Sequence, residues 1–359
     1  MRIIRCAPRP NGVRAFLETQ IRGRHRFAPS RMLNPSALLC SRQTKQPPRS
    51  LAIDKQDNHP TPRLVDMPPR SRSDADPPPS CYAVAKPNTQ DEFFMPFLNA
   101  CRSDSIDLAL RLVPGREAWM LTDGLNQAMQ RGNLTLARRL FELGVMYDAD
   151  TIDHSYLSLE AGKLLFEFGF QVNDPCVWGA TFLTGLVKRN DIPYVRYALE
   201  LGADPNLGPS LISSTSTSIR VGDMRPAENM GCCLNDAAAY STPEMFALLL
   251  EYGAKLENAI PLHFAAGYGL DAAPRERIPM MEYLIGLGVD VNGLDQKSNH
   301  AQYGTPLQCA IKWGKVEEGK WLLRNGADPD KKSQWGSSAR DYAARWAKYN
   351  ELGTLLNNV

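Results

Sequence analysis

Sulfur and imidazole side chains are the first candidates for chemistry in this chain of 359 residues. The eight cysteines lie at scattered positions, with no CxxC pair and no Cys/His cluster at the spacing of a zinc site. Cys232 and Cys233 are adjacent. A vicinal pair can be redox-active, but the more ordinary role of such residues is buried packing. We therefore expect no bound metal and reduced, intracellular thiols.

One glycine-rich segment could in principle hold a nucleotide. Residues 267–272 read GYGLDA, which matches the loose GxGxxA form of a dinucleotide-binding loop. That loop must follow a β-strand, whereas this segment follows a helical pattern. The sequence contains no GxxxxGK[ST], HExxH or GxSxG motif. We therefore expect a protein that is not an enzyme, with no catalytic residues and no cofactor.

A repeated pattern begins near residue 91 and supplies the elements that would position any binding residues. Its clearest unit opens with Gly304-Thr305-Pro306-Leu307, carries the pair Leu322-Leu323 and closes at Gly326, which lies 20 residues after Pro306. The same interval separates Gly124 from Gly144, Phe182 from Gly202, and Cys233 from Gly253. Each unit predicts two short helices that must stack on neighbouring units to bury their apolar faces.

Other parts of the repeat depart from this spacing. The opening Pro261-Leu262-His263 is well formed, but its closing Gly288 comes seven residues late, which predicts an insertion around 270–279. The unit that ends at Gly169 is degenerate in its first helix. Residues 91–113 are expected to form a helical pair that caps the array.

This pattern resembles the ankyrin repeat, in which a Thr-Pro-Leu-His turn opens an inner helix and Gly-Ala-Asp closes the outer one. The resemblance implies an all-α solenoid of stacked helix-turn-helix units with hairpin-loop fingers, about eight units over residues 91–359, the outer ones degenerate. It also implies that His263 bridges neighbouring turns by hydrogen bonding. The long fingers and the segment 303–307 are similar to ankyrin-repeat proteins of filamentous fungi, some of which accompany biosynthetic or regulatory gene sets.

Helix-end signals agree with this frame. Thr242 and Asn133 stand where an outer helix needs a side-chain cap, and Pro243 occupies the first helical position. The closing glycines fit positions just past a helix end, where the backbone turns left-handed.

The resemblance implies that the residue seven positions after the turn proline is exposed on the concave face of the array. In this chain that column contains Tyr, Trp and Arg, the side chains that dominate protein-binding surfaces. The alternative is that each aromatic ring packs on the next unit and only covers the array. The predicted partner-binding residues are Arg131, Arg189, Tyr240, Tyr268, Trp313 and Trp346.

The partner expected from this column is another protein, acidic at one end and apolar at the other. The chain would act as an adaptor, a scaffold or an inhibitor, and we expect it to be monomeric. Three long loops, 209–230, 270–279 and 293–303, could add contacts. Nucleic acid is not expected as a ligand of the array, because residues 91–359 carry a net charge of −8.

Residues 1–90 differ from the rest in charge and in proline content. Residues 1–50 hold 11 basic residues and one acid, Glu18, and 14 of the 27 prolines lie in residues 1–90. This composition predicts a disordered N-terminal tail and linker. Val13, Phe16, Leu17 and Ile21 have helical spacing among arginines, which is typical of a mitochondrial transit peptide and also compatible with an unstructured basic arm.

The basic tail suggests an alternative function. The chain would then be a targeting or regulatory subunit that its tail directs to an organelle or an acidic surface. No apolar run reaches the ~20 residues that span a bilayer. We expect an intracellular protein, cytoplasmic or nuclear, with mitochondrial targeting as the alternative.

Overall fold

A computed structural model describes residues 92–176, 180–209, 226–268, 276–295, 304–346 and 356. The chain divides into two units, residues 1–60 and 61–359, and all described residues belong to the second. The predicted tail and its amphipathic segment lie outside the described residues, as do most of the three loops. The domain boundary near residue 90 therefore stays a prediction.

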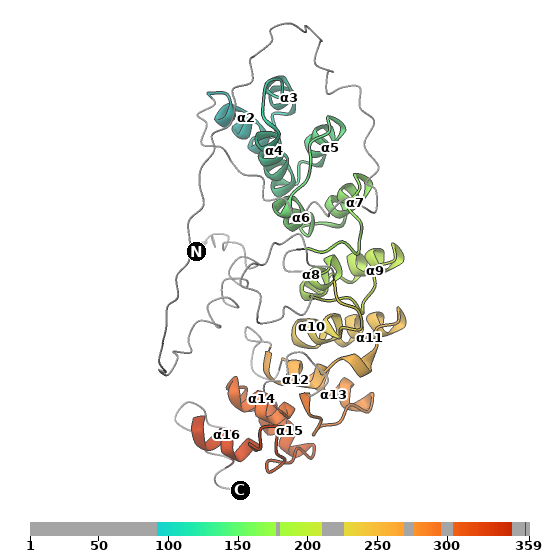
Figure 1. Ribbon diagram of the computed structural model, residues 1–359, viewed down its shortest axis with the longest axis vertical. Coiled ribbons are helices and arrows are strands. Elements are labelled where there is room, and N and C mark those ends of the chain that lie inside the picture. The colour runs from blue at the N-terminus through green and yellow to red at the C-terminus, as the bar shows by residue number, and fades with distance from the viewer. Residues whose placement is uncertain are drawn as a thin grey trace, which may run out of the picture. The chain divides into compact units, whose positions relative to one another are not determined.

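The described residues are helical and contain no β-strand, only two isolated bridges. The helices follow one another in pairs (Figure 1), with one further helix, α16 (Ala339–Trp346), at the end. Within this part of the chain no helix is long and apolar enough to cross a membrane. The pairs are α2 (Phe94–Arg102) with α3 (Ile106–Leu112), α4 (Ala118–Arg131) with α5 (Leu134–Glu142), α6 (Ala149–Ser155) with α7 (Leu159–Glu167), α8 (Phe182–Arg189) with α9 (Ile192–Glu200), α10 (Cys232–Tyr240) with α11 (Pro243–Glu251), α12 (Pro261–His263) and the π-helical turn η6 (Phe264–Tyr268) with α13 (Ile278–Gly286), and α14 (Pro306–Lys312) with α15 (Val316–Arg324).

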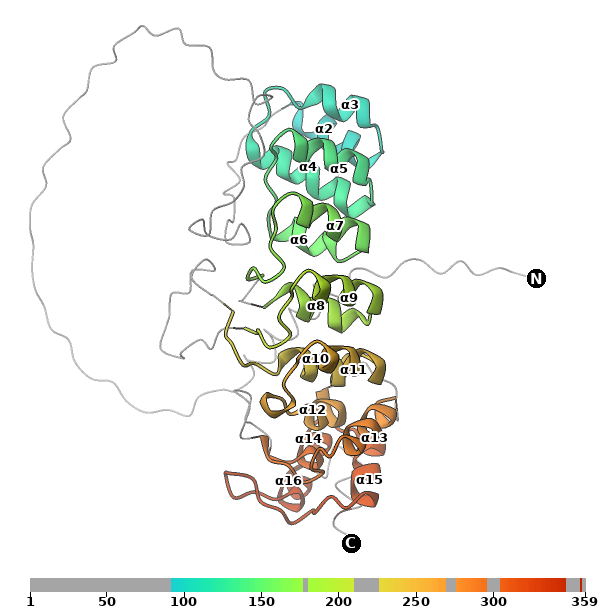
Figure 2. The same ribbon diagram turned by 90° about the vertical axis from the view of Figure 1, so that its right-hand side faces the viewer.

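The first helix of each pair, which we call the inner helix, contacts the inner helices of the neighbouring pairs. Contacts join α2 to α4, α4 to α6, α8 to α10, α10 to η6, η6 to α14, and α14 to α16. Figure 2 shows the second, outer helices following one another beside them. Residues at equivalent positions of different repeats, although far apart in the sequence, therefore lie on the same side of the stack.

The predicted helix ends are confirmed. Thr305 and Gln308 form a capping box on α14, in which each side chain binds the backbone amide of the other residue. The side chain of Asn133 accepts from the Leu136 amide at 3.0 Å, and that of Thr242 caps α11 ahead of Pro243. These caps satisfy amides that the first turn of a helix leaves without partners.

The predicted closing glycines all have positive φ. A residue with a Cβ is strained in this left-handed conformation, so glycine is favoured at this turn. The angles range from 83° to 97° at Gly144, Gly169, Gly202, Gly253, Gly288 and Gly326.

A continuous core lies between the inner and outer helices. Of the predicted pair, Leu322 is fully buried and Leu323 is half-buried. At the equivalent positions of an earlier unit, Leu140 is fully buried and Phe141 is 5% exposed. Packing between pairs is close where small residues permit it. Gly162 on α7 is such a position, because the ring of Tyr194 on α9 fills the space that a Cβ would need.

One predicted insertion is shorter than expected. The sequence predicts an insertion around 270–279, but α13 begins at Ile278, and Arg277 is its N-terminal cap residue. Pro279 lies in the first turn of α13, where a proline fits because its missing N–H would have no intrahelical partner. Residues 269–275 of this insertion lie outside the described part of the chain.

Candidate functional site

Buried polar side chains tie the opening turns of neighbouring units together. His263, predicted to bridge turns, does so: its Nε2 lies 2.9 Å from the Gly304 carbonyl oxygen. In the next unit, Gln308 occupies the same turn position and donates to the Ser337 carbonyl at 2.6 Å. Asn235 accepts from the Ile260 amide at 2.9 Å. These bonds fix the register of the inner helices against one another.

Burial also sets the protonation of the bridging histidine. It lowers the pKa of His263, while the bond to Gly304 and the nearby Asp295 act in the opposite direction. A neutral imidazole that donates through Nε2 matches the carbonyl opposite it. The imidazole of His263 is therefore used in the contact between neighbouring turns.

A second series of bonds joins the hairpin loops. Asn206, four residues after the closing glycine of its unit, donates to the Gly253 carbonyl at 3.0 Å and accepts from the Lys255 amide at 2.9 Å. Asn173 binds Gly202 and Asp204 in the same way, and Asn292 binds Gly326 and Asp328. We call this series the asparagine ladder. It was not predicted from the sequence.

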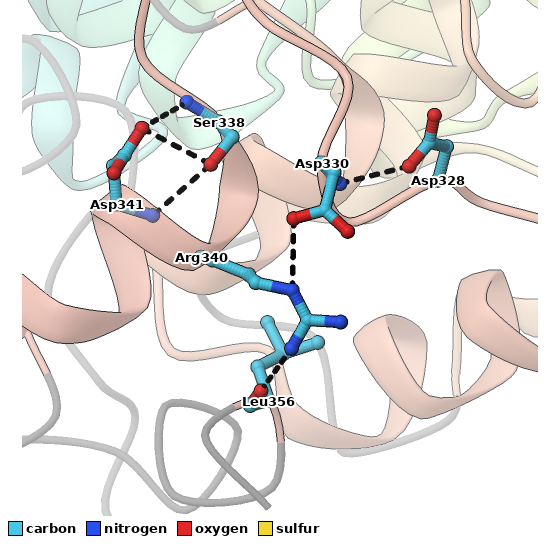
Figure 3. Close-up of polar contacts among 6 residues, drawn as sticks. All are labelled: Asp328, Asp330, Ser338, Arg340, Asp341 and Leu356. Atoms are coloured by element: carbon cyan, nitrogen blue, oxygen red, sulfur yellow. Dashed lines mark hydrogen bonds and ion pairs between the residues drawn. The ribbon is translucent and has the colours of Figure 1, made fainter. Parts of the chain in front are cut away.

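The ladder ends at the last unit, where Asp330 stands in the asparagine position. A carboxylate cannot donate to the carbonyl of a further unit, and Asp330 instead accepts from Nε of Arg340 at 2.8 Å (Figure 3). Nη1 of the same arginine donates to the Leu356 carbonyl at 2.6 Å. The Ser338 hydroxyl accepts from the Asp341 amide and caps α16, while the Asp341 carboxylate accepts from the Ser338 amide. Arg340 thus joins the last hairpin to the segment that contains buried Leu356.

The two predicted arginines are exposed and lie at equivalent positions. Arg131 is the last residue of α4, and Arg189 is the last residue of α8. Beside Arg189, Lys188 forms an ion pair with Asp236 of α10 at 3.4 Å. Burial raises the pKa of Asp236, and Lys188 partly offsets this effect. The free ends of these inner helices therefore present positive charge.

The predicted aromatic residues are less exposed than the arginines. Tyr240, the last residue of α10, is half-buried. Trp313, just past α14, is also half-buried, and a Cβ on Gly267 would lie 3.0 Å from its Cδ1. Part of the Trp313 ring therefore packs on the preceding unit. Tyr268 and Trp346 end η6 and α16, but their side chains are not among those described.

Sequence reasoning missed one member of this column. Tyr156 is the C-terminal cap residue of α6, the position that Trp313 has on α14. Its ring stacks on Phe182 at 4.5 Å, and its hydroxyl lies 3.8 Å from Sγ of Cys176. Its Cζ would lie 2.7 Å from a Cβ on Gly185. At this position the aromatic ring packs between units. The signal was available, because Tyr156 lies seven residues after Ala149, the first residue of α6.

Burial disfavours the thiolate form of the described cysteines. Cys101, Cys233 and Cys309 are buried, and Cys232 is half-buried. Burial raises the pKa of the Cys101 and Cys232 thiols to about 12, so the nucleophilic thiolate is scarce at neutral pH. Within the described ranges no group of His, Cys, Asp and Glu residues is arranged to hold a metal ion.

Comparison with known families gives one match. Residues 304–334 match the family model of the ankyrin repeat. No curated protein matches the sequence. The matched stretch contains α14, α15 and the hairpin that follows them, with the Thr305 capping box at its start. The chain therefore contains an ankyrin repeat at residues 304–334.

Proposed function

We propose that the described helical pairs form a single ankyrin solenoid that binds another protein along the exposed ends of its inner helices. The ankyrin repeat at 304–334 is a protein-interaction module. The left-handed glycine and the asparagine ladder recur in units outside this match, which supports one continuous array. Such an array can recognise a partner through the shape of its surface and through its exposed side chains.

The observation that carries this proposal is the exposure of Arg131 and Arg189 at equivalent helix ends. Arginine is enriched at binding hot spots because its guanidinium makes several directed hydrogen bonds to carboxylates. A partner that spans both helix ends would present acidic groups to them. The half-buried Tyr240 and Trp313 would then meet a more apolar part of the same partner.

The array would serve as an adaptor, a scaffold or an inhibitor, depending on what its partner does. The basic residues 1–50 support an additional targeting role. Deleting residues 1–90 and observing whether the protein changes location in cells tests that role separately.

Affinity capture with matched arginine variants tests the binding proposal. The bait is the full chain, as wild type, as Arg131→Ala/Arg189→Ala, or as the control Arg196→Ala/Arg324→Ala. The control removes two exposed arginines from the outer helices α9 and α15 and so changes the net charge equally. Circular dichroism confirms that all three baits are helical.

We expect a partner that wild type and control retain and that the inner-helix variant loses. The dissociation constant, then measured with the purified partner, should rise at least about tenfold for Arg131→Ala/Arg189→Ala. Equal affinity of all three baits would show that the inner-helix arginines do not form the binding surface.

A further inference from the structure

Before the ladder starts at Asn173, the equivalent position is Asp148, which caps α6. Between Asn173 and Asn292 the asparagine ladder is interrupted at one junction. Between the unit that closes at Gly253 and the unit that closes at Gly288, the ladder position is Glu257. A carboxylate can accept but cannot donate, so it cannot reproduce both arms of an asparagine amide. No hydrogen bond joins Glu257 to Gly288 or Asp290, and all three belong to the described part of the chain.

The backbone at this hairpin begins with the same turn as the hairpins after Gly202 and Gly288. In these three units, the amide five residues after the closing glycine donates to the carbonyl two residues after it. The distance is 3.2 Å for Asn258 to Lys255, against 3.3 Å for Leu207 to Asp204 and 3.0 Å for Gly293 to Asp290. Here the turn continues as a short 3-10 helix, η5 (Leu256–Asn258), because the Ala259 amide also donates to the Leu256 carbonyl, at 3.1 Å. Position 257 therefore differs from the ladder positions in its side chain and in the turn that carries it.

The neighbouring asparagine does not replace the missing amide. Nδ2 of Asn258 is buried and has no hydrogen-bond partner among the described groups. Asn258 is displaced by one residue from the ladder position. The hairpin tips of this junction are therefore not tied by an asparagine side chain.

The same junction is held firmly at its other side. Asn235 on α10 accepts from the Ile260 amide at 2.9 Å, and Nη1 of Arg277 donates to the Ser241 carbonyl at 2.7 Å. Arg277 is 9% exposed, so its bond is largely shielded from water. The inner helix that follows is also irregular, since α12 passes into the π-helical turn η6. Such turns are frequent at functional positions.

We infer that this junction is a hinge of the array, fixed at the helix side by Asn235 and Arg277 and free to open at the hairpin tips beside Glu257. The hinge lies between the units that carry Arg131, Arg189 and Tyr240 and the unit that carries Trp313. Opening it changes the spacing between these two groups. The inference rests on the hydrogen bonds of the fold and does not require the proposed binding function.

Residue-resolved hydrogen exchange on the full chain tests the hinge without a partner. The Asp204 and Asp328 amides donate hydrogen bonds to asparagine side-chain oxygens. Relative to intrinsic rates, the Asp290 amide should exchange at least about tenfold faster than these two amides. The Ile260 amide, on the fixed side, should remain protected. Equal protection of Asp290, or an Ile260 amide as fast as that of Asp290, would overturn the inference.

Two substitutions at one exposed position separate a missing amide from other causes. Glu257→Asn supplies both arms of the ladder and should slow the Asp290 exchange about tenfold, to the level of Asp204. Glu257→Ala removes the carboxylate without adding an amide and should leave the exchange unchanged. No slowing by Glu257→Asn, or equal slowing by Glu257→Ala, would contradict the hinge.

Discussion

Replacing Gly162 with alanine should destabilise the array strongly. Gly162 lies in α7, and a Cβ at this position would overlap Oη and Cζ of Tyr194 from α9. Tyr194 is fully buried, and its hydroxyl donates to the Ser155 carbonyl at 3.1 Å. The ring can move away only by giving up that bond and disturbing the core around it.

The expected magnitude follows from three contributions. Overpacking a close-packed core costs about 1–3 kcal/mol. A buried hydroxyl that loses its partner costs about 1–3 kcal/mol. Alanine in a helix recovers about 1 kcal/mol relative to glycine. The free energy of unfolding should therefore fall by about 3 kcal/mol in Gly162→Ala.

A second helical glycine provides the matched control. A Cβ at Gly286 in α13 would have no other atom within 4 Å. Gly286→Ala should therefore leave stability unchanged or raise it by up to about 1 kcal/mol. Urea unfolding followed by far-ultraviolet circular dichroism measures both variants. A Gly162→Ala protein as stable as wild type would refute the packing of α9 on α7 described above.

Two further predictions concern the bonds between units. Burial lowers the pKa of His263, so the unfolded chain binds a proton first and stability should fall as pH drops below about 6.5, the usual histidine value. His263→Gln, which copies Gln308 of the next unit, should weaken this pH dependence in urea unfolding measured between pH 7.5 and 5; an unaltered profile would assign it to other groups. Asn206→Ala should lower the free energy of unfolding by about 1–2 kcal/mol through the loss of two ladder bonds. Asn206→Asp keeps the acceptor alone and should lose less, so equal losses would argue against the bond that Asn206 accepts from the Lys255 amide.

Local features of the fold were predictable from the sequence because each depends on a few neighbouring residues. The cap at Asn133, the proline after Thr242 and the glycine at each unit's end are set by backbone geometry within one turn. The spacing of 20 residues predicted where the apolar pairs lie in units whose residues no longer match the family consensus. The role of His263 followed from the resemblance to the ankyrin turn.

Contacts between units were harder to predict. The asparagine ladder was visible as a recurring residue four positions after a closing glycine. Its bonds, however, depend on how one hairpin lies on the next, which no local pattern specifies. Tyr156 was missed because its unit lacks the family's turn residues. The start of α13 was misplaced because Pro279 was assigned to a loop, although a proline also suits a first helical turn.

The degree of exposure along the predicted binding column could not be derived from sequence either. Arg131 and Arg189 project from helix ends into solvent, whereas Trp313 is partly covered because Gly267 lets its ring approach. Arginine and tryptophan are both typical of binding surfaces, so residue type alone did not distinguish the exposed positions from the covered one. The neighbouring unit decided which of them remained available.

The most direct test of the central claim is a hydrogen-exchange footprint of the full chain with its captured partner bound. The amides at the ends of α4, α8 and α10, near Arg131, Arg189 and Tyr240, should become more protected, while those of the outer helices α5 and α9 should not change. Protection confined to the outer helices would contradict binding along the inner-helix ends.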